Sequence, residues 1–376
     1  MNYFYERIVK KIYSVLLMLL NKRRSFFVKK NTLLIVKLDS IGDYVLFRNF
    51  IRVIKESDHY RNYKITLCGN IWWKELAEGL DKEFINDFIW VDYRRMTDSG
   101  YSYKQYREIH SRGFETLIHP TYSRDIISDN VVIYSGAKYK IGYDGDTINL
   151  SEVQKRENNL AYTSLMVSRS KHRFEFNRNK DFFEQLFSLQ IPTLKPQIDY
   201  KTNKEEIIII CPGAKDAFRR WSAENFVRLC DLLQSKFPKA DFVICGSEAD
   251  SLIAKEIISK SQFHFSDLTG KLNLNELVAM LAKCKIAIVN DSGPFHIAVA
   301  LGSKVVCISN GNNYGRFTPY PSEMNTESKV LYPIQITEMS EEERLENFGK
   351  VVEHVDINEI KAEQVFSEIE KMFDVK

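Results

Sequence analysis

The chain has 376 residues, of which 44% are hydrophobic and 27% are charged. This length and composition fit two globular domains with full cores, and they exclude a chain that is disordered or built from low-complexity sequence. The net charge is only +3, and residues 1–30 hold eight Lys or Arg against one acid, so the rest of the chain carries −4. A near-neutral body does not predict a nucleic-acid partner, and the positive charge is confined to an N-terminal arm.

Residues 1–30 form a basic arm with an apolar stretch. Its apolar stretch, residues 12–20, has nine residues without a charge, whereas a helix that spans a bilayer needs about 18 to 20. No small-residue cleavage site follows the run, which argues against a signal peptide.

Two interpretations of this arm stay open. The favoured one places it on an anionic membrane surface at the cytoplasmic face, with apolar side chains in the lipid and cations near the headgroups. The residues are Leu16, Leu17 and Leu20 for the lipid and Lys22, Arg23 and Arg24 for the headgroups. In the other interpretation the arm is a terminal helix that packs on the protein itself or on a partner.

The six cysteines are widely spaced and form no CxxC pair, so neither a disulfide framework nor a zinc site is predicted. Four of them end apolar runs, where a thiol behaves as a small hydrophobic group. This usage fits a reducing cytoplasm. The cysteines are Cys68, Cys211, Cys230, Cys245, Cys284 and Cys307.

Both halves of the chain repeat an apolar strand, a turn and a helix, which predicts an α/β fold with two parallel sheets and crossover helices. In the first half the predicted strands cover residues 32–38, 63–68, 116–119 and 139–143. In the second half they cover residues 207–211, 241–245, 285–289 and 304–309.

Two prolines, Pro192 and Pro196, follow a helix that is predicted to begin near Asn179, and they mark the boundary between the halves. The predicted parts are the arm at 1–30, a first domain at 31–190, a second domain at 191–350, and a C-terminal helix at 351–376 that could pack back on the first domain. Three polar stretches, residues 93–112, 144–180 and 337–347, are predicted as surface loops.

The second half contains a turn that is suited to a phosphate. In IVNDSGPFHIAVALG a strand ends at Val289, and Pro294 is preset for the first turn of a helix. Free backbone amides and the positive end of the helix dipole attract a diphosphate there, and His296 could donate to it. The alternative is a capped helix with a buried, satisfied histidine.

A second turn of this kind is CPGAKDAFRRWSAENF, in which Lys215, Arg219 and Arg220 flank Gly213 before a helix that Ser222 caps. Ligands of α/β sheets bind at the carboxyl edge, where such cations suit an anion. A solvated basic loop is the alternative. Two such turns in one sheet together favour a nucleotide diphosphate.

Five segments of the chain, in this order, resemble family 9 glycosyltransferases, the heptosyltransferase-like enzymes of lipopolysaccharide assembly. They are LLIVKLDSIGDYVLFRNFIRVIK, GAKYKIGY, PGAKDAFRRWSAENFVRLCDLL, GSEAD and LTGKLNLNELVAMLAKCKIAIVNDSGPFHIAVALGSKVVCIS. The resemblance covers about residues 32–320, and NDSGPFH is its most specific part. It implies a GT-B architecture with an acceptor domain, a donor domain and a cleft between them. It also implies an inverting reaction that needs no metal and no cofactor beyond the nucleotide sugar.

The same resemblance implies roles for single residues. Asp43, in the turn after the first strand, resembles the general base that takes the acceptor's proton, although by itself the position favours a helix cap. Arg219 or Arg220 resembles the cation that neutralises the leaving diphosphate. The implied donor contacts are Gly213, Lys215, Glu248 for the ribose, Leu272 for the base, and Asp291, Ser292, Gly293 and His296 for the diphosphate sugar.

On the acceptor side, His119, Ser123 and Arg124 follow a strand end and are predicted to hold the acceptor's phosphate or hydroxyls. Residues 144–146 spell DxD, a metal motif of another glycosyltransferase architecture. Here they follow a strand and are interpreted as an Asx turn, so no metal ligand is predicted.

The predicted function is therefore transfer of a sugar, such as heptose from ADP-heptose, to a hydroxyl of a lipopolysaccharide or other glycolipid. The turn at residues 310–313 departs from the Gly-Pro-Thr of many relatives, which leaves the donor sugar open. A sugar-nucleotide epimerase or hydrolase on the same scaffold and a non-catalytic nucleotide- or glycan-binding relative are the alternatives. An oxidoreductase is disfavoured because no GxGxxG follows a strand.

Overall fold

The computed structural model of the protein describes residues 13, 15–20, 28–192, 195–347, 349 and 355–374. The chain forms two compact units. Unit 1 comprises Met1–Lys171 and Arg178–Ile191, and unit 2 comprises His172–Asn177 and Pro192–Lys376.

Unit 1 is built on a six-stranded parallel sheet in the order β3-β2-β1-β4-β5-β6. Its central strand β1 is exposed at its start and fully buried over its last five residues, as a strand covered on both faces requires. The strand order reverses between β1 and β4, so this is the switch point where an α/β sheet opens a crevice at its carboxyl edge. The strands are β1 (Lys29–Lys37), β2 (Lys64–Asn70), β3 (Asp87–Val91), β4 (Phe114–His119), β5 (Tyr139–Tyr143) and β6 (Ser164–Met166).

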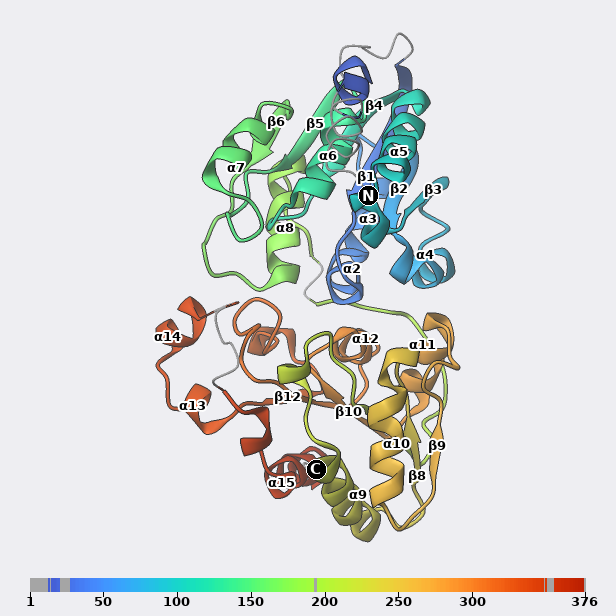
Figure 1. Cartoon of the computed structure of the whole chain (residues 1–376), viewed down its shortest axis with the longest axis vertical. Helices are drawn as coiled ribbons and strands as arrows, with labels where there is room; N and C mark the ends of the chain where they lie inside the picture. The colour runs from blue at the N-terminus through green and yellow to red at the C-terminus, as the bar shows by residue number, and fades with distance from the viewer. Residues whose placement is uncertain are drawn as a thin grey trace, which may run out of the picture. The chain divides into compact units, whose positions relative to one another are not determined.

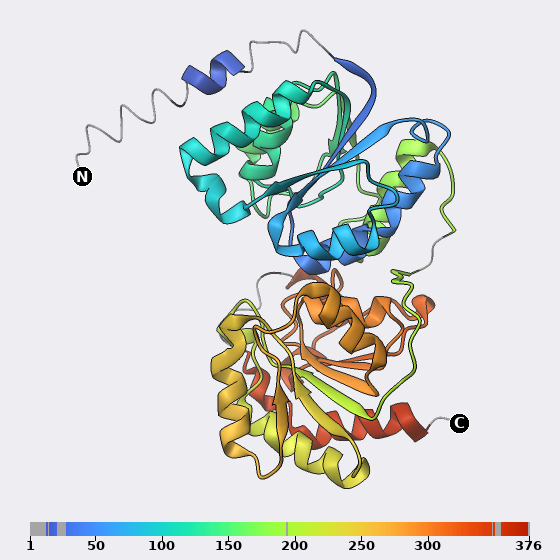
Figure 2. The same cartoon turned by 90° about the vertical axis from the view of Figure 1, so that its right-hand side faces the viewer.

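Helices cover both faces of this sheet (Figures 1 and 2). They are α2 (Ile41–Phe47), α3 (Asn49–Glu56), α4 (Lys74–Leu80), α5 (Ser99–Arg112), α6 (Ile126–Tyr134), α7 (Glu152–Asn159) and α8 (Glu175–Phe187), with short 3-10 turns η1 (Ile71–Trp73) and η2 (Tyr93–Thr97).

The prediction of surface loops is wrong for much of all three stretches. Residues 144–180 contain α7, β6 and the start of α8, residues 341–346 are helical, and most of residues 93–112 is helix α5. Asp98 caps its start by accepting from the Tyr101 N–H, and Gly113 ends it with a left-handed φ of 67°. Tyr106 and Ile109 are buried three residues apart, which is the helical spacing that the polar residues around them obscure.

The N-terminal helix, residues 15–20, packs on unit 1. Leu17 and Leu20 are buried in the same cluster as Met96 and Tyr106, so the prediction that these two leucines enter a membrane is wrong. Leu16 is partly buried, and Val15, Met18 and Leu19 are 44–50% exposed. Lys22, Arg23 and Arg24 lie outside the described residues. In the part of the chain that the structure describes, no helix combines the length and hydropathy needed to cross a bilayer.

Unit 2 repeats the plan with a parallel sheet in the order β12-β11-β10-β7-β8-β9. The order reverses between β7 and β10, which is the switch point of this unit. The strands are β7 (Ile207–Cys211), β8 (Asp241–Ile244), β9 (Phe265–Asp267), β10 (Ile286–Asn290), β11 (Val305–Ile308) and β12 (Ser328–Leu331).

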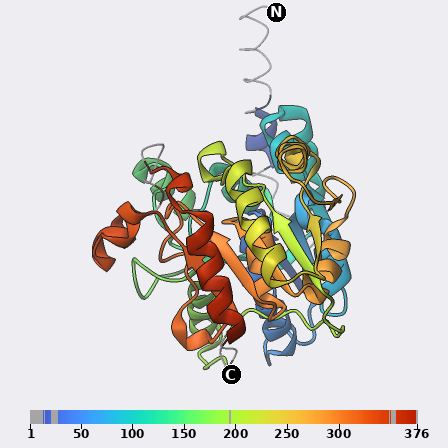
Figure 3. The ribbon, with the colours of Figure 1, turned by 90° about the horizontal axis from the view of Figure 1, so that it is seen from below.

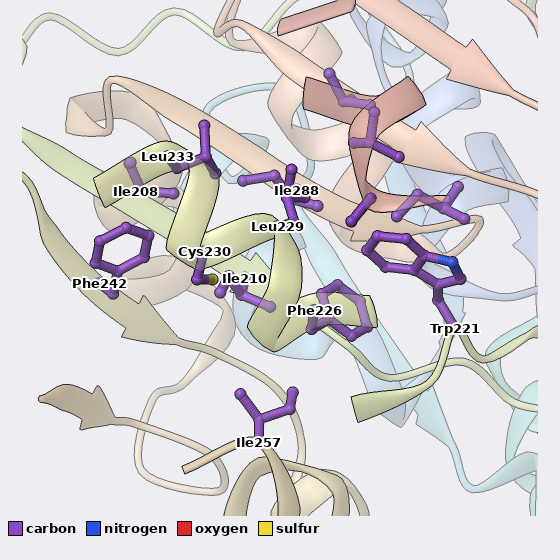
Figure 4. Packing of buried hydrophobic residues seen from close by; sticks show 14 of the residues in the cluster. Ile208, Ile210, Trp221, Phe226, Leu229, Cys230, Leu233, Phe242, Ile257 and Ile288 are labelled. Carbon is purple, nitrogen blue, oxygen red and sulfur yellow. The ribbon is translucent and has the colours of Figure 1, made fainter. Parts of the chain in front are cut away.

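The helices of unit 2 are α9 (Ala223–Lys236), α10 (Ser251–Lys260), α11 (Leu274–Lys283), α12 (Gly293–Ala300), α13 (Ile334–Thr337), α14 (Glu341–Glu346) and α15 (Ala362–Asp374). Its 3-10 turns are η3 (Ala217–Arg219), η4 (Glu248–Asp250), η5 (Ser322–Met324) and η6 (Ile357–Glu359). Figure 4 shows Phe226, Leu229 and Leu233 of α9 packed over Ile208 and Ile288 of the sheet.

The C-terminal helix α15 lies beside α9 (Figure 3). Val365, Ile369 and Met372 join the core that α9 covers, and the Trp221 Nε1–H donates to the Ile360 carbonyl at 2.8 Å. The apolar face of α15 is therefore buried in unit 2.

Candidate functional site

The loops that leave β7 and β10 are joined at the switch point of unit 2. Asn290 is fully buried, its Nδ2 donates to the Pro212 carbonyl at 2.6 Å, and its Oδ1 accepts from the Trp221 N–H at 3.3 Å. One side chain thus fixes the two predicted anion-binding turns to each other. Sequence analysis passed over Asn290, although a buried amide at the end of an apolar strand is a signal for such a role.

Gly213 is required by packing. A Cβ at this position would overlap the carboxyl group of Asp250. That carboxyl is held by the Ser247 N–H and hydroxyl, both at 2.8 Å. Gly213 therefore lets the turn after β7 lie against the start of α10.

Arg219 is the cation fixed at the start of α12. Its Nη2 donates to the Asp291 carbonyl and lies 3.4 Å from the Asp291 carboxylate. The side chain is 14% exposed, and its Nε has no hydrogen-bond partner among the described residues. A buried N–H without an acceptor is costly, so this guanidinium has an unused donor.

The other two predicted cations are placed differently. Arg220 is half-buried, and its Nε donates to the Ala214 carbonyl at 2.8 Å. Lys215 is exposed to solvent. The structure thus gives this loop two partly buried cations, Arg219 and Arg220, and one exposed cation, Lys215.

Helix α12 starts without a side-chain cap. Ser292 is its N-cap residue, but the Ser292 hydroxyl donates back to the Asn290 carbonyl at 3.2 Å instead of accepting from a first-turn amide. The helix begins at Gly293, with Pro294 in its first turn. Ser292 therefore leaves the backbone N–H groups of this turn without a capping side chain, as far as the described residues show, and the helix dipole adds a positive partial charge there.

Asp291 is 2% exposed and organises the loop. Its Oδ2 accepts from the Ser309 hydroxyl and from the Asn313 Nδ2, both at 3.0 Å. The carboxylate thus joins the loop after β10 to the loop after β11.

His296 lies in the first turn of α12 and is 3% exposed. Its Nδ1 is 2.9 Å from the Tyr320 hydroxyl. Burial, and then the nearby Arg219 charge, lower the His296 pKa to about 3. The imidazole is therefore neutral at pH 7.

Glu248 and Leu272 follow β8 and β9 at the same carboxyl edge, on the β8 side of β7. Glu248 is exposed in η4, whereas Leu272 is half-buried just before α11. Gly270, with φ at +69°, lies against Glu248, where a Cβ would overlap its carboxylate. These two predicted donor contacts are thus accessible to a ligand that extends along this edge.

Asp43 occupies the first turn of α2, directly after β1, and is half-buried. A carboxylate in this position is stabilised by the helix dipole. Asp39, which sequence analysis did not single out, lies at the same switch point. It pairs with the buried Lys37 at 2.6 Å and accepts from the Thr121 hydroxyl at 3.0 Å, which joins the ends of β1 and β4.

Two of the three predicted acceptor residues are interior. His119 is fully buried with its Nδ1 2.7 Å from the Tyr162 hydroxyl, and burial lowers its pKa to about 3. Arg124 is 1% exposed and donates to the Asp144 carbonyl at 3.1 Å. Ser123 is half-buried. His119 and Arg124 therefore stabilise the carboxyl edge of this sheet from the interior of unit 1.

The DxD stretch forms a turn, as predicted. Asp146 Oδ1 accepts from the Ile148 N–H at 3.2 Å, which is an Asx-turn bond. Asp146 Oδ2 accepts from the Ser123 hydroxyl at 2.7 Å, and Asp144 pairs with Lys155 at 3.0 Å. Within the described ranges, no three His, Cys, Asp or Glu side chains gather in a way that could hold a metal ion.

The model of glycosyltransferase family 9 (heptosyltransferase) matches residues 106–347, more than half of the chain. Lipooligosaccharide heptosyltransferase 2 of Haemophilus ducreyi is 36% identical over 107 residues, which cover 27% of this chain and 30% of the relative. The chain thus matches less than a third of the length of this curated relative.

Solved structures match nearly the whole chain. The glycosyl transferase family 9 protein from Veillonella parvula DSM 2008 gives a TM-score of 0.70 at 18% identity, covering 92% of this chain and 97% of that one. The E. coli heptosyltransferase WaaC with ADP gives 0.68 at 15% identity, covering 91% and 99%. At these identities the likeness shows the fold, an α/β fold of the GT-B type with two Rossmann-like units. The chain belongs to glycosyltransferase family 9, the heptosyltransferase family.

Proposed function

We propose that this family 9 glycosyltransferase transfers a sugar from a nucleotide sugar to a hydroxyl of a lipopolysaccharide-type glycolipid, with inversion of the anomeric carbon and without a metal. One observation carries the proposal: the uncapped start of α12 lies beside Arg219, whose buried Nε has no partner among the described residues. Backbone amides and a fixed guanidinium together suit a diphosphate.

The proposed donor is ADP-heptose. The solved E. coli relative was described with ADP, which supports an adenine nucleotide as the leaving group here. The diphosphate would meet the Ser292 hydroxyl, the Gly293 N–H, His296 and Arg219. Lys215 and Arg220 would add charge, Glu248 would hold the ribose, and Leu272 would lie against the base.

The chemistry is a single displacement. The acceptor oxygen forms a bond to the anomeric carbon while the bond to the diphosphate oxygen breaks, and ADP leaves with that electron pair. Asp43, the proposed base, takes the hydroxyl proton. Arg219 stabilises the negative charge that develops on the diphosphate, so its effect is larger in the transition state than in the bound donor.

On the acceptor side we propose Ser123 as a direct contact, with His119 and Arg124 as the buried residues that hold this sheet edge. The buried pair of Arg124 and Asp129, 3.5 Å apart, would keep the loop after β4 in place.

We also propose that the N-terminal helix rests on the cytoplasmic face of the membrane. Val15, Met18 and Leu19 form its exposed apolar face, whereas Leu17 and Leu20 are buried in the core of unit 1. Basic residues of the arm would add about 1 kcal/mol each near anionic lipid.

A transfer assay tests the reaction. Purified protein receives ADP-heptose and a glycolipid acceptor that lacks heptose, with a chelator present, and the anomeric configuration of the product is read by NMR. Asp43→Asn keeps the shape of the side chain and is expected to slow transfer by about 10²- to 10⁴-fold, the usual contribution of a general base. Release of free sugar or of an epimer without transfer would contradict the proposal and favour a hydrolase or epimerase.

A further inference from the structure

Tyr320 and His296 form a buried pair behind the start of α12. Tyr320 is 7% exposed, and its ring packs against Phe174 and Phe295 with centroids 4.8 and 5.6 Å apart. The Tyr320 hydroxyl therefore lies in apolar surroundings, 2.9 Å from His296 Nδ1.

The surroundings of this pair determine whether the Tyr320 hydroxyl or Nδ1 of His296 carries the proton of their hydrogen bond. Among the residues that the structure describes, Nδ1 of His296 is the hydrogen-bond partner of the Tyr320 hydroxyl. Burial raises the Tyr320 pKa well above its usual value, so the phenol keeps its proton. A buried O–H needs an acceptor, and Nδ1 can accept only when it is unprotonated.

His119 provides the opposite case in the same chain. Its partner Tyr162 donates to Asp129 Oδ1 at 2.7 Å, so the Tyr162 oxygen accepts from Nδ1–H of His119 at 2.7 Å. Nε2 of His119 is buried without a hydrogen-bond partner among the described residues, as expected for a nitrogen that carries no proton. Because Tyr162 donates to a carboxylate, it accepts from His119, and the proton of His119 lies on Nδ1 instead of Nε2. In the described part of the chain, no carboxylate is paired with Tyr320 in this way.

We propose that Tyr320 is a positioning residue that holds His296 in the tautomer with the proton on Nε2, as a fixed donor to the ligand's diphosphate. The identity of this ligand rests on the proposed function, whereas the tautomer does not. A neutral imidazole preset as a donor can bind a phosphate oxygen without first taking up a proton, and its orientation is fixed before the ligand arrives.

The first test is ¹⁵N NMR of the histidine rings in the full chain without ligand, with His296→Gln and His119→Gln to assign the signals. We expect a pyridine-type shift for Nδ1 and a pyrrole-type shift for Nε2 of His296, and the reverse for His119. In Tyr320→Phe the His296 signals should move toward a mixture of tautomers. A proton on Nδ1 of His296 in the unmodified protein overturns the proposal.

The second test is a double-mutant cycle on ADP affinity, measured by calorimetry. Tyr320→Phe should weaken ADP binding about fivefold, the net effect of one hydrogen bond. It should have no further effect in the His296→Gln background, because the tyrosine acts only through the histidine. An additive loss in both backgrounds would mean a merely structural role. Tyr332→Phe, in the same unit with its ring against Tyr314, is the matched control and should leave ADP affinity unchanged.

The two tests separate the possible failures. If the unmodified protein binds no nucleotide, the proposed function fails, while the NMR spectra still decide the tautomer. If the tautomer is as expected but Tyr320→Phe binds ADP as tightly as the unmodified protein, the positioning role is overturned.

Discussion

Asn290, Asp291 and Arg219 show how single side chains build the proposed donor site. Asn290 joins the loops after β7 and β10, and Asp291 joins the latter to the loop after β11. Arg219 is then held between the Asp291 carbonyl and carboxylate. The family resemblance pointed to Arg219 and Asp291. The contacts of Asp291 with Ser309 and Asn313 could not be predicted, because spacing in a sequence does not reveal which polar atoms of neighbouring loops meet.

Gly213→Ala should destabilise unit 2 by about 1–3 kcal/mol, because the new methyl group overlaps the Asp250 carboxyl. Thermal or denaturant unfolding measures this change. Gly100→Ala is the control, since its Cβ would meet only one atom at 3.4 Å inside helix α5, and it should be neutral or stabilising. Equal effects of the two substitutions would contradict the packing argument.

The buried His119 of unit 1 should also make the free energy of unfolding of this unit depend on pH. The native His119 pKa is about 3, against about 6.5 in the unfolded chain. Below pH 6.5 the unfolded state therefore binds a proton that the native state does not, so stability is greatest above this pH and falls as pH drops toward 3.

His119→Gln should reduce the pH slope of the unfolding free energy by about 1.4 kcal/mol per pH unit between pH 6 and 4.5. Tryptophan fluorescence in a Trp221→Phe background reports on unit 1, where the other three tryptophans lie. His59→Gln removes an exposed histidine and serves as the control. An unchanged slope in His119→Gln would show that this imidazole is not buried neutral.

At the scale of elements, all eight strands predicted from the sequence are present, and the four that were missed share one feature. β3 and β6 are the edges of the first sheet, and β9 and β12 are the edges of the second. β6 has three residues, none of them fully buried. Central strands can be recognised as unbroken apolar runs because both of their faces are covered. A short edge strand forms because the neighbouring strand offers free backbone hydrogen-bond groups, and the local sequence contains no pattern that shows this.

Substitutions on the exposed face and on the buried face of the N-terminal helix should have different effects. Replacing Val15, Met18 and Leu19 together by serine should lower the affinity for anionic liposomes at least tenfold, because each apolar side chain contributes about 1.5 kcal/mol or more when buried in lipid. Co-sedimentation with vesicles measures this affinity. Leu17→Ala should instead destabilise unit 1 and leave binding to vesicles unchanged, because Leu17 is buried in the core. Unchanged vesicle binding in the triple variant would contradict the membrane proposal.

Helix α15 should be essential to unit 2. Ile369 is fully buried in the core that α9 covers, so Ile369→Ala should destabilise unit 2 by about 2–5 kcal/mol. Lys371→Ala, at a residue whose side chain is 64% exposed, should change stability by less than about 0.5 kcal/mol. Denaturant unfolding of the two variants compares them, and a mild effect of Ile369→Ala would mean that α15 is dispensable.

For the whole molecule, two copies of one βα plan each place their proposed chemistry at the switch point of a sheet. In unit 1 the switch point carries Asp39 and, just after it, Asp43; in unit 2 it carries Asn290 and Arg219. The fold and this general location followed from apolar runs and turn residues. The contacts that fix the site, such as Asn290 with Pro212 and His296 with Tyr320, join residues 24 to 78 positions apart, and pairings of that kind are set by tertiary packing.

The central claim is that the switch point of unit 2 binds a nucleoside diphosphate, and calorimetric titration of ADP, UDP, GDP and CMP tests it most directly. The account predicts that ADP binds most tightly and that Arg219→Gln weakens its binding about 10- to 100-fold, as expected for a charged hydrogen bond. Arg228→Gln, at an exposed arginine paired with Glu363 at 2.8 Å, should bind ADP like the unmodified protein. Absence of nucleotide binding, or equal ADP affinity in Arg219→Gln, would contradict the account.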